Sequence, residues 1–335
     1  MKKMKRSMIG LLLVIAAVLA GCGAQSEEGA SANSEGKSDG GFPEKPITVV
    51  VSFAAGGGTD VGARILLPYV EEELGVPITV VNKPGGGGWV GWNELVNSKT
   101  DGYTIGYINT PNLMTGYMNP ELNRDNSLED FDMIANHVTD YGAIAVAAND
   151  DRFDTIEDLI EFAKENTVTT TSTGVGSDDH ILAMKLNEAL GTKFEAVHGE
   201  GAANGKAGVL GGHVDVYFAN VGEVAAPAES GELKALAVSA PERSEFMKDV
   251  PTLEEKGYGE INGFSARGVA YPAGMDEEVM KTIQDAFEKA LNNPEQIQKM
   301  ADMGLAVDPL IGEDYYNFLK EEEEVVEKLK PLMGW

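Results

Sequence analysis

The chain has 335 residues, of which 43% are hydrophobic and 24% charged, and this composition excludes a fibrous or wholly disordered protein. Its formal charge of −28 argues against a nucleic-acid binder, because such proteins neutralise phosphates with an excess of cations. A single cysteine excludes a disulfide framework and a metal site built from several thiolates.

Residues 1–21 have the composition of a secretory signal peptide. Four basic residues precede an apolar run from Ile9 to Ala20, and the run ends in Leu-Ala-Gly-Cys at Cys22. About 12 apolar residues are too few to span a bilayer as a helix, which takes ~20. The Leu-Ala-Gly-Cys ending resembles the bacterial lipobox, whose cysteine is lipidated and becomes the new N-terminus. The sequence therefore predicts lipidation at Cys22, with an ordinary signal peptide and an incidental cysteine as the alternative.

Cleavage before Cys22 removes four basic residues and no acidic one, so the charge of the remaining chain changes from −28 to −32. Residues 22–41 consist of the cysteine and a stretch without large apolar side chains, which cannot bury enough surface to fold. We expect this segment to be a flexible tether. The body is then extracytoplasmic, anchored to the outer face of the cytoplasmic membrane.

From Pro46 onward the chain alternates strand and helix patterns, which predicts an α/β fold with a wound sheet. The predicted strands are residues 46–53, 76–81, 103–108, 144–148, 167–172, 214–219, 235–239, 264–271 and a short segment at 305–307. The predicted helices end at Leu74 and Val96 in the first third, and then span residues 155–165, 177–190, 276–292 and 312–330. Pro68 lies inside the first helix and is expected to kink it or end it early.

Residues 53–60, Phe-Ala-Ala-Gly-Gly-Gly-Thr-Asp, follow a predicted strand and open a predicted helix. Glycines let the backbone approach a ligand closely, and a helix start offers unpaired N–H groups and a partial positive charge. This combination favours a carboxylate or phosphate site. The alternative is a tight strand–helix turn with Thr59 as the N-cap.

Residues 172–180, Ser-Thr-Gly-Val-Gly-Ser-Asp-Asp-His, repeat the order of strand, glycine loop and helix start. Ligands of open α/β sheets lie beyond the carboxyl ends of the strands, so two domains that face each other would bring both loops to one cleft. His180 is either a ligand contact or a capped structural residue. Residues 84–91 match the dinucleotide pattern only weakly, because no acid follows about 20 positions on, and we expect a flexible loop at the rim of the cleft.

The motifs of catalysis are absent from the sequence. It has no Gly-x-Ser-x-Gly, no phosphate-binding Gly-x-x-x-x-Gly-Lys and no His-Glu-x-x-His, and its four histidines lie far apart. We therefore expect no catalytic residues, no metal site and no cofactor. A secreted hydrolase that uses Ser177 or Ser265 with His180 is a minor alternative without a recognisable pairing of base and nucleophile.

Residues 42–335 carry a series of motifs in a fixed order. They are PxKPIxVVVxFAAGGGTDxxAR, VxNxPGGGG, DGYT, GGHVDVxF, LKALAVS, PERS, DVPTLxExGY and PAG. This set resembles the substrate-binding proteins of tripartite tricarboxylate transporters, the TctC or Bug family, and the lipobox fits a Gram-positive member. The resemblance implies a two-lobed Venus flytrap of the periplasmic-binding-protein type, with a mixed sheet flanked by helices in each lobe. Lobe 1 would comprise residues 42–143 and 267–335, and lobe 2 residues 144–266, with the ligand cleft between them.

The resemblance also implies a receptor that captures a small carboxylate, such as a di- or tricarboxylate, and delivers it to membrane permease subunits of the transporter. We expect a monomer. One ligand carboxylate would be held mainly by backbone N–H groups and waters between the two glycine loops. The implied ligand-binding residues are Phe53, Ala55, Gly56, Gly57, Gly58, Thr59, Asp60, Ser172, Thr173, Gly174, Ser177, His180 and Arg267. A sensory lipoprotein that serves a two-component receptor is the alternative function.

Three segments depart from the family pattern. Glu200 stands in a Gly-Glu-Gly segment where the family often has Tyr-Lys-Gly, Asp178 and Asp179 stand where small or neutral residues are usual, and Arg267 ends a segment that is commonly aromatic. If the acids face the cleft they would repel a multiply charged anion, whereas Arg267 would supply a clamp for a carboxylate. If they point to solvent they have no such effect. A monocarboxylate or an amino acid is therefore an alternative ligand to a di- or tricarboxylate.

Overall fold

The computed structural model describes residues 41–335. The predicted signal peptide, Cys22 and all of the tether except residue 41 lie outside the described residues. The strands are β1 (Ile47–Val51), β2 (Ile78–Asn82), β3 (Thr104–Thr110), β4 (Phe131–Ala147), β5 (Val168–Ser172), β6 (Phe194–His198), β7 (Tyr217–Asn220), β8 (Leu233–Ser239), β9 (Phe264–Pro272) and β10 (Val307–Ile311). The helices are α1 (Gly58–Leu74), α2 (Trp89–Val96), α3 (Asn112–Met118), α4 (Ile156–Glu165), α5 (Asp178–Leu190), α6 (Ala202–Leu210), α7 (Val221–Glu229), α8 (Glu277–Leu291), α9 (Pro294–Ala301) and α10 (Glu313–Met333).

The largest sheet has the strand order β10-β4-β9-β3-β1-β2. Strands β2, β1 and β3 run parallel, whereas β9 is antiparallel to β3 and β4 is antiparallel to β9. Valines of β1 are buried on both faces of the strand, as is usual in a parallel sheet covered by helices. The sheet is therefore mixed, and the α/β class predicted from the alternating pattern is confirmed.

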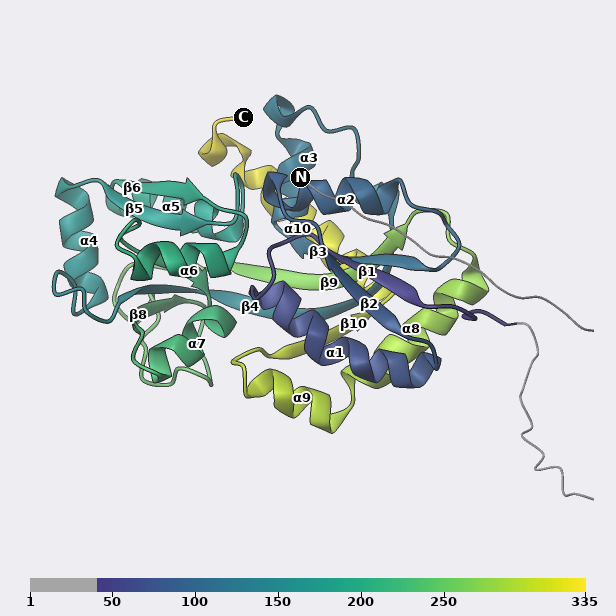
Figure 1. Ribbon diagram of the computed structural model, residues 1–335. Helices are drawn as coiled ribbons and strands as arrows, with labels where there is room; N and C mark the ends of the chain where they lie inside the picture. Colours follow the sequence, from purple (N-terminus) through teal and green to yellow (C-terminus); the bar gives the residue numbers. More distant parts are fainter. Residues whose placement is uncertain (1–40) are drawn as a thin grey trace, which may run out of the picture. The chain divides into compact units, whose positions relative to one another are not determined.

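Strand β4 is long enough to take part in two sheets (Figure 1). Residues 131–141 pair with β9, whereas residues 142–147 pair with β7 and β8. Strands β5 and β6 form a separate parallel pair. The buried apolar residues divide in the same way, because α1, β1, β3 and α8 pack around one cluster and α4, β5 and α5 pack around another. Strand β4 thus pairs with strands of both regions.

Most of the predicted elements are found within a few residues of the expected bounds. Thr155 and Asp158 form a capping box at the start of α4, and Gly75 closes α1 in the left-handed conformation. The prediction that Pro68 ends α1 early is wrong, because the helix continues to Leu74. Pro68 lies on the exposed side, where water can satisfy the carbonyl that loses its partner.

The sequence pattern missed the first half of β4, together with β6, α3, α6, α7 and α9. The missed half of β4 contains Asn136 and His137, which are polar yet fully buried. Asn136 donates to the carbonyl of Asp308, and His137 hydrogen-bonds Tyr107 and Gln296, so the amide nitrogen of Asn136 and both ring nitrogens of His137 have partners. Hydrophobic alternation cannot reveal a strand of this kind. None of the helices within residues 41–335 combines the length and apolar character needed to cross a membrane.

Candidate functional site

The first glycine loop leads into α1 without a side-chain cap. Gly57 is the N-cap and the helix begins at Gly58, so the interpretation of Thr59 as the N-cap is wrong. The carboxylate of Asp60 folds back and accepts the Gly56 N–H at 2.9 Å, and Arg64 and Asn82 also donate to it. Burial alone would raise the pKa of Asp60, but the hydrogen bonds from Arg64, Gly56 and Asn82 hold it below its usual value. Asp60 thus fixes the loop.

The second glycine loop is also held by its own side chains. Ser177 is the N-cap of α5, and its hydroxyl accepts the His180 N–H at 3.2 Å and hydrogen-bonds Ser172 at 2.9 Å. The Nδ1 atom of His180 accepts the Gly176 N–H, and its ring packs edge-on against His198. Burial, and secondarily His198, lowers the pKa of His180 to about 4. His180 therefore stabilises this loop, and among the described residues its ring forms no hydrogen bond with a serine hydroxyl.

The two loops converge on a cavity of about 30 Å³, which holds roughly one water molecule. Its lining comes from the carboxyl ends of β1, β3, β5, β6 and β7 and from β9. The lining residues are Phe53, Gly57, Gly58, Thr59, Asn109, Asn112, Thr173, Asp178, Gly201, Ala202, Asn220, Glu223, Ser265 and Arg267. We call this space the inner cavity.

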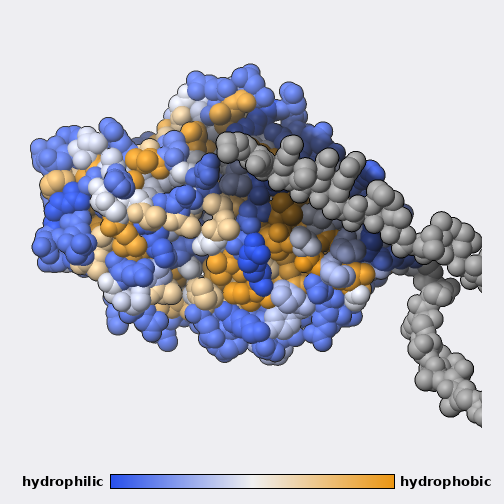
Figure 2. All heavy atoms as spheres, in the orientation of Figure 1, coloured by the Kyte–Doolittle hydropathy of each residue, from blue (hydrophilic) through white to orange (hydrophobic). Residues whose placement is uncertain are grey.

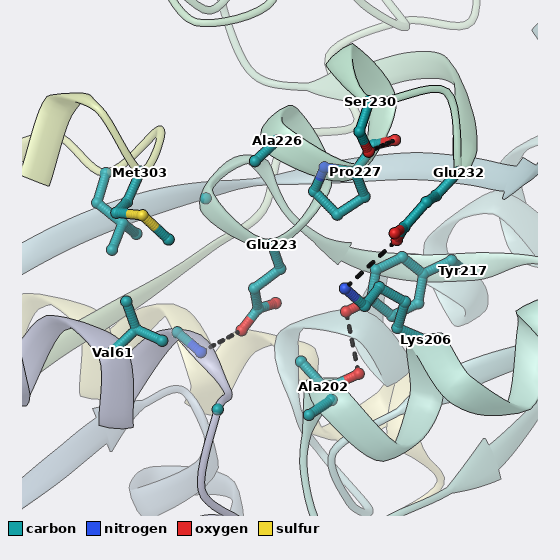
Figure 3. A pocket seen from close by; sticks show the side chains of 15 residues that line it. Val61, Ala202, Lys206, Tyr217, Glu223, Ala226, Pro227, Ser230, Glu232 and Met303 are labelled. Carbon is teal, nitrogen blue, oxygen red and sulfur yellow. Dashed lines mark hydrogen bonds and ion pairs between the residues drawn. The ribbon is translucent and has the colours of Figure 1, made fainter.

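A larger pocket of about 360 Å³ adjoins the inner cavity and shares Gly58, Ala202 and Glu223 with it (Figure 3). Val61 of α1, Lys206 of α6 and Pro227 of α7 lie around it. We call it the outer pocket, and its volume is within the range usual for small-molecule sites. Apolar residues gather toward the middle of the face drawn in Figure 2, and hydrophilic residues dominate its outline.

Arg267 is the cation of the inner cavity, and its side chain is only 3% exposed. Its Nη1 lies 3.0 Å from Oδ2 of Asp140 on β4. Its Nη2 donates to Oδ1 of Asn220 at 2.9 Å and lies 3.5 Å from Oε1 of Glu223. The guanidinium is therefore already matched by carboxylates of the chain, as a buried charge must be.

Glu223 brings a carboxylate to the N-terminus of α1. It belongs to the capping box of α7, and its Oε1 accepts the Gly58 N–H at 3.0 Å. Figure 3 shows the side chain reaching from α7 toward the first turn of α1. Helix N-termini attract anions, so the position expected for a ligand carboxylate is taken by the protein's own.

Asp178 and Asp179 are buried, with 8% and 4% of their surfaces exposed. The interpretation that these acids and Arg267 point to solvent is therefore wrong, whereas Glu200 is exposed. Oδ2 of Asp178 accepts from Asn220 at 2.7 Å. Burial raises the pKa of Asp178, Asp179 and Asp140, and that of Asp140 reaches about 7 despite the neighbouring guanidinium. The region thus holds more carboxyl groups than cations.

The glycine-rich segment 84–91 lies against the second glycine loop. A Cβ at Gly174 would lie 2.9 Å from Cα of Gly87, so the two backbones meet without room for a side chain. Thr115 of α3 donates to the carbonyl of Gly176 at 2.8 Å, and the Ala54 N–H donates to the carbonyl of Glu200 at 3.3 Å. These contacts connect segments before residue 144 with segments after it.

Among the residues predicted from the sequence, Phe53, Gly57, Gly58, Thr59, Thr173 and Arg267 line the inner cavity, and Gly56 lines the outer pocket. Ala55, Asp60, Ser172, Gly174, Ser177 and His180 line neither, because most are engaged within their own loops. Their contact with a ligand stays a prediction.

Sequence reasoning missed Asn109, Asn112, Asn220 and Glu223. Each lies at or just beyond the carboxyl end of β3 or β7, and that position was the available signal. The part of the chain that the structure describes contains no group of three side chains arranged to bind a metal ion.

Comparison with known proteins assigns this chain to a family. Residues 63–333 match the model of the family described as "Tripartite tricarboxylate transporter family receptor" (TctC). A protein of Cupriavidus necator, "UPF0065 protein in gbd 5'region", is 30% identical over 294 residues, which cover 86% of this chain and 88% of that one. "Protein BugT" of Bordetella pertussis is 28% identical over 78% of this chain and 81% of its own length. The structure of the periplasmic binding protein BugD superposes with a TM-score of 0.81 at 26% identity, covering 88% of this chain and 99% of BugD.

Proposed function

The chain belongs to the TctC family of tripartite tricarboxylate transporter receptors, and on that premise we propose that it captures a small carboxylate for a permease of this type. Family membership makes it an extracytoplasmic solute receptor of the periplasmic-binding-protein fold and not an enzyme. The ligand class, the residues that hold the ligand and the permease are the proposed part. We propose that the permease takes the ligand from the closed receptor.

The observation that carries the proposal is the position of Glu223. Its carboxylate meets the Gly58 N–H at the start of α1 and approaches Arg267, so this place accommodates a carboxylate group. The amides of Thr59 and Asp60 follow in the same helical turn, where a helix has no acceptor of its own for them. A ligand carboxylate that displaces Glu223 would meet these donors and the guanidinium together.

We propose that residues 42–143 with 267–335 and residues 144–266 act as two lobes that open and close around the ligand. The change of partners of β4 between Tyr141 and Gly142 supports a hinge there, as does the division of the buried clusters. The inner cavity of about 30 Å³ is too small for an organic acid, so the ligand needs the contacts around it to separate. Binding energy would then favour the closed arrangement.

Thermal unfolding of the purified protein against organic acids tests the ligand class. The panel contains mono-, di- and tricarboxylates, aromatic acids and amino acids, and the protein is refolded from denaturant first to remove any bound ligand. A ligand at ~100 times its Kd stabilises the folded state by about 2.7 kcal/mol, which raises the midpoint by several degrees. The matching amides and alcohols serve as controls and should give no shift. An absence of shift with every acid would contradict the carboxylate proposal.

We propose that Cys22 is lipidated and tethers the receptor to the outer face of the cytoplasmic membrane. The basic segment, the short apolar run and the Leu-Ala-Gly-Cys ending support it. We expect the Cys22→Ser variant to appear in the soluble or released fraction, whereas the native chain sediments with membranes and yields a lipid-modified N-terminal peptide by mass spectrometry. Equal membrane association of the two proteins would contradict the anchor.

A further inference from the structure

The inner cavity is surrounded by more carboxyl groups than cations. Asp178 and Glu223 line it, and Asp140 and Asp179 are buried close behind. Among the described residues that line this cavity, Arg267 is the only cation. Lys206 lies in the outer pocket, where it forms a 3.8 Å ion pair with Glu232. Four carboxyl groups therefore share one guanidinium in a region from which water is largely excluded.

The second observation is a buried hydrogen-bond acceptor that has no donor among the described residues. Asn109 lines the inner cavity and is 4% exposed, and its amide nitrogen donates to Thr59 Oγ1 at 2.8 Å. Its other polar atom, Oδ1, is buried without a hydrogen-bond partner among the described residues. A buried acceptor without a donor is costly, so this atom is suited to a donor supplied from outside the chain.

These features bear on the ligand class in different ways. A ligand with two carboxylates would bring another acidic group into a cavity that already has more carboxyl groups than cations. It would also offer no hydrogen-bond donor to Asn109. A positively charged nitrogen would be attracted to the acids and would also supply that donor. The donors at Gly58 and Arg267, on the other hand, still suit one carboxylate.

We propose that the ligand carries a positively charged nitrogen as well as a carboxylate, with the nitrogen facing Asp178 and Asn109 and the carboxylate facing Arg267 and the start of α1. This inference rests on the proposed function and narrows it from small carboxylates in general to amino-carboxylates. Burial raises the pKa of Asp178 and Asp179, and the neighbouring acids add to the rise at Asp179; a cationic nitrogen beside these carboxyls would oppose that shift.

Matched pairs of compounds test the inference by calorimetric titration of the wild-type protein at pH 7.5. The pairs are succinate and aspartate, glutarate and glutamate, isovalerate and valine, and butyrate and 4-aminobutyrate, with putrescine as an amine without a carboxylate. We expect at least one amino member to bind ten-fold or more tightly than its partner. Tighter or equal binding of every partner without nitrogen would overturn the inference and leave the carboxylate function intact. Binding of putrescine alone would overturn the carboxylate function, and the absence of any binding would overturn both.

The Asp178→Asn variant tests whether the preference for an amino group arises at this site. The substitution keeps the size of the side chain and an oxygen that can accept from Asn220, and it removes the charge. We expect its affinity for the amino member to fall ten-fold or more, and its affinity for the partner without nitrogen to change less. Asp285→Asn on the exposed face of α8 is the matched control and should bind like the wild type. Unchanged affinity in Asp178→Asn would contradict the inference, and the wild-type comparison decides the matter if this variant does not fold.

Discussion

Replacing Gly58 by Ala is expected to weaken ligand binding about 10- to 100-fold while α1 still forms. An added Cβ would lie 2.3 Å from Nη1 of Arg267 and 2.8 Å from Oε1 of Glu223. Arg267 cannot simply move aside, because Asp140 and Asn220 hold its guanidinium. Overpacking of this kind costs about 1–3 kcal/mol, and each 1.4 kcal/mol corresponds to a factor of ten in Kd. The helix itself favours Ala over Gly.

A helical glycine away from both pockets provides the matched control for this prediction. Gly208 of α6 lines neither pocket, and a Cβ there would meet nothing closer than 3.4 Å, so Gly208→Ala should bind nearly as the wild type does. The midpoint shift produced by the strongest ligand is compared among the three proteins. Equal shifts in Gly58→Ala and Gly208→Ala would mean that the start of α1 is not part of the binding site.

Replacing Arg267 by Met is expected to be the most destabilising single change at the site. Met fills much of the same space but leaves Asp140 and Glu223 without the guanidinium that they contact. Removal of one partner of a buried ion pair costs about 3–5 kcal/mol. Denaturant unfolding at pH 7.5 measures the loss. Arg243→Met removes an exposed pair with Glu255 and is expected to cost about 1 kcal/mol or less.

The loss in Arg267→Met should depend on pH in a defined direction. Burial raises the pKa of Asp140 from its ordinary 3.8 to about 7, so the folded chain binds a proton that the unfolded chain has released. The stability due to this group is present at low pH and is lost as the pH rises through about 7. Without Arg267 the pKa of Asp140 rises further. We therefore expect the difference between variant and wild type to shrink from pH 7.5 to pH 5.5. An equal or larger difference at pH 5.5 would contradict the account of Asp140.

The local features of the fold were predictable because each depends on neighbouring residues. The strand before residue 53, the start of a helix near Gly58 and the capping box at Thr155 follow from periodicity, glycine position and side-chain spacing. The first half of β4 was not predictable in this way. Its buried His137 is satisfied by Tyr107 and Gln296, which come from β3 and α9, and no local pattern shows such partners.

The candidate site also combines features that the local sequence predicts with features that depend on the assembled fold. Glycines and helix starts in the sequence identified both loops, but they could not show which loop groups are already engaged by the chain. Ser177 and His180 turn out to hold their own loop, and Glu223 reaches the start of α1 from α7. The role of Arg267 was visible only as a departure from the family pattern. Its pairing with Asp140 requires β4 and β9 to lie side by side, which is a property of the assembled sheet.

The measurement that tests the central claim most directly is the crystal structure of the protein with the acid that gives the largest thermal shift. The claim is that a ligand carboxylate takes the place of Glu223 at the start of α1 and at Arg267. The account predicts one carboxylate oxygen within hydrogen-bond distance of the Gly58 or Thr59 amide, another beside the Arg267 guanidinium, and Glu223 moved away from both. A ligand bound elsewhere, with Glu223 still on the Gly58 N–H, would contradict it.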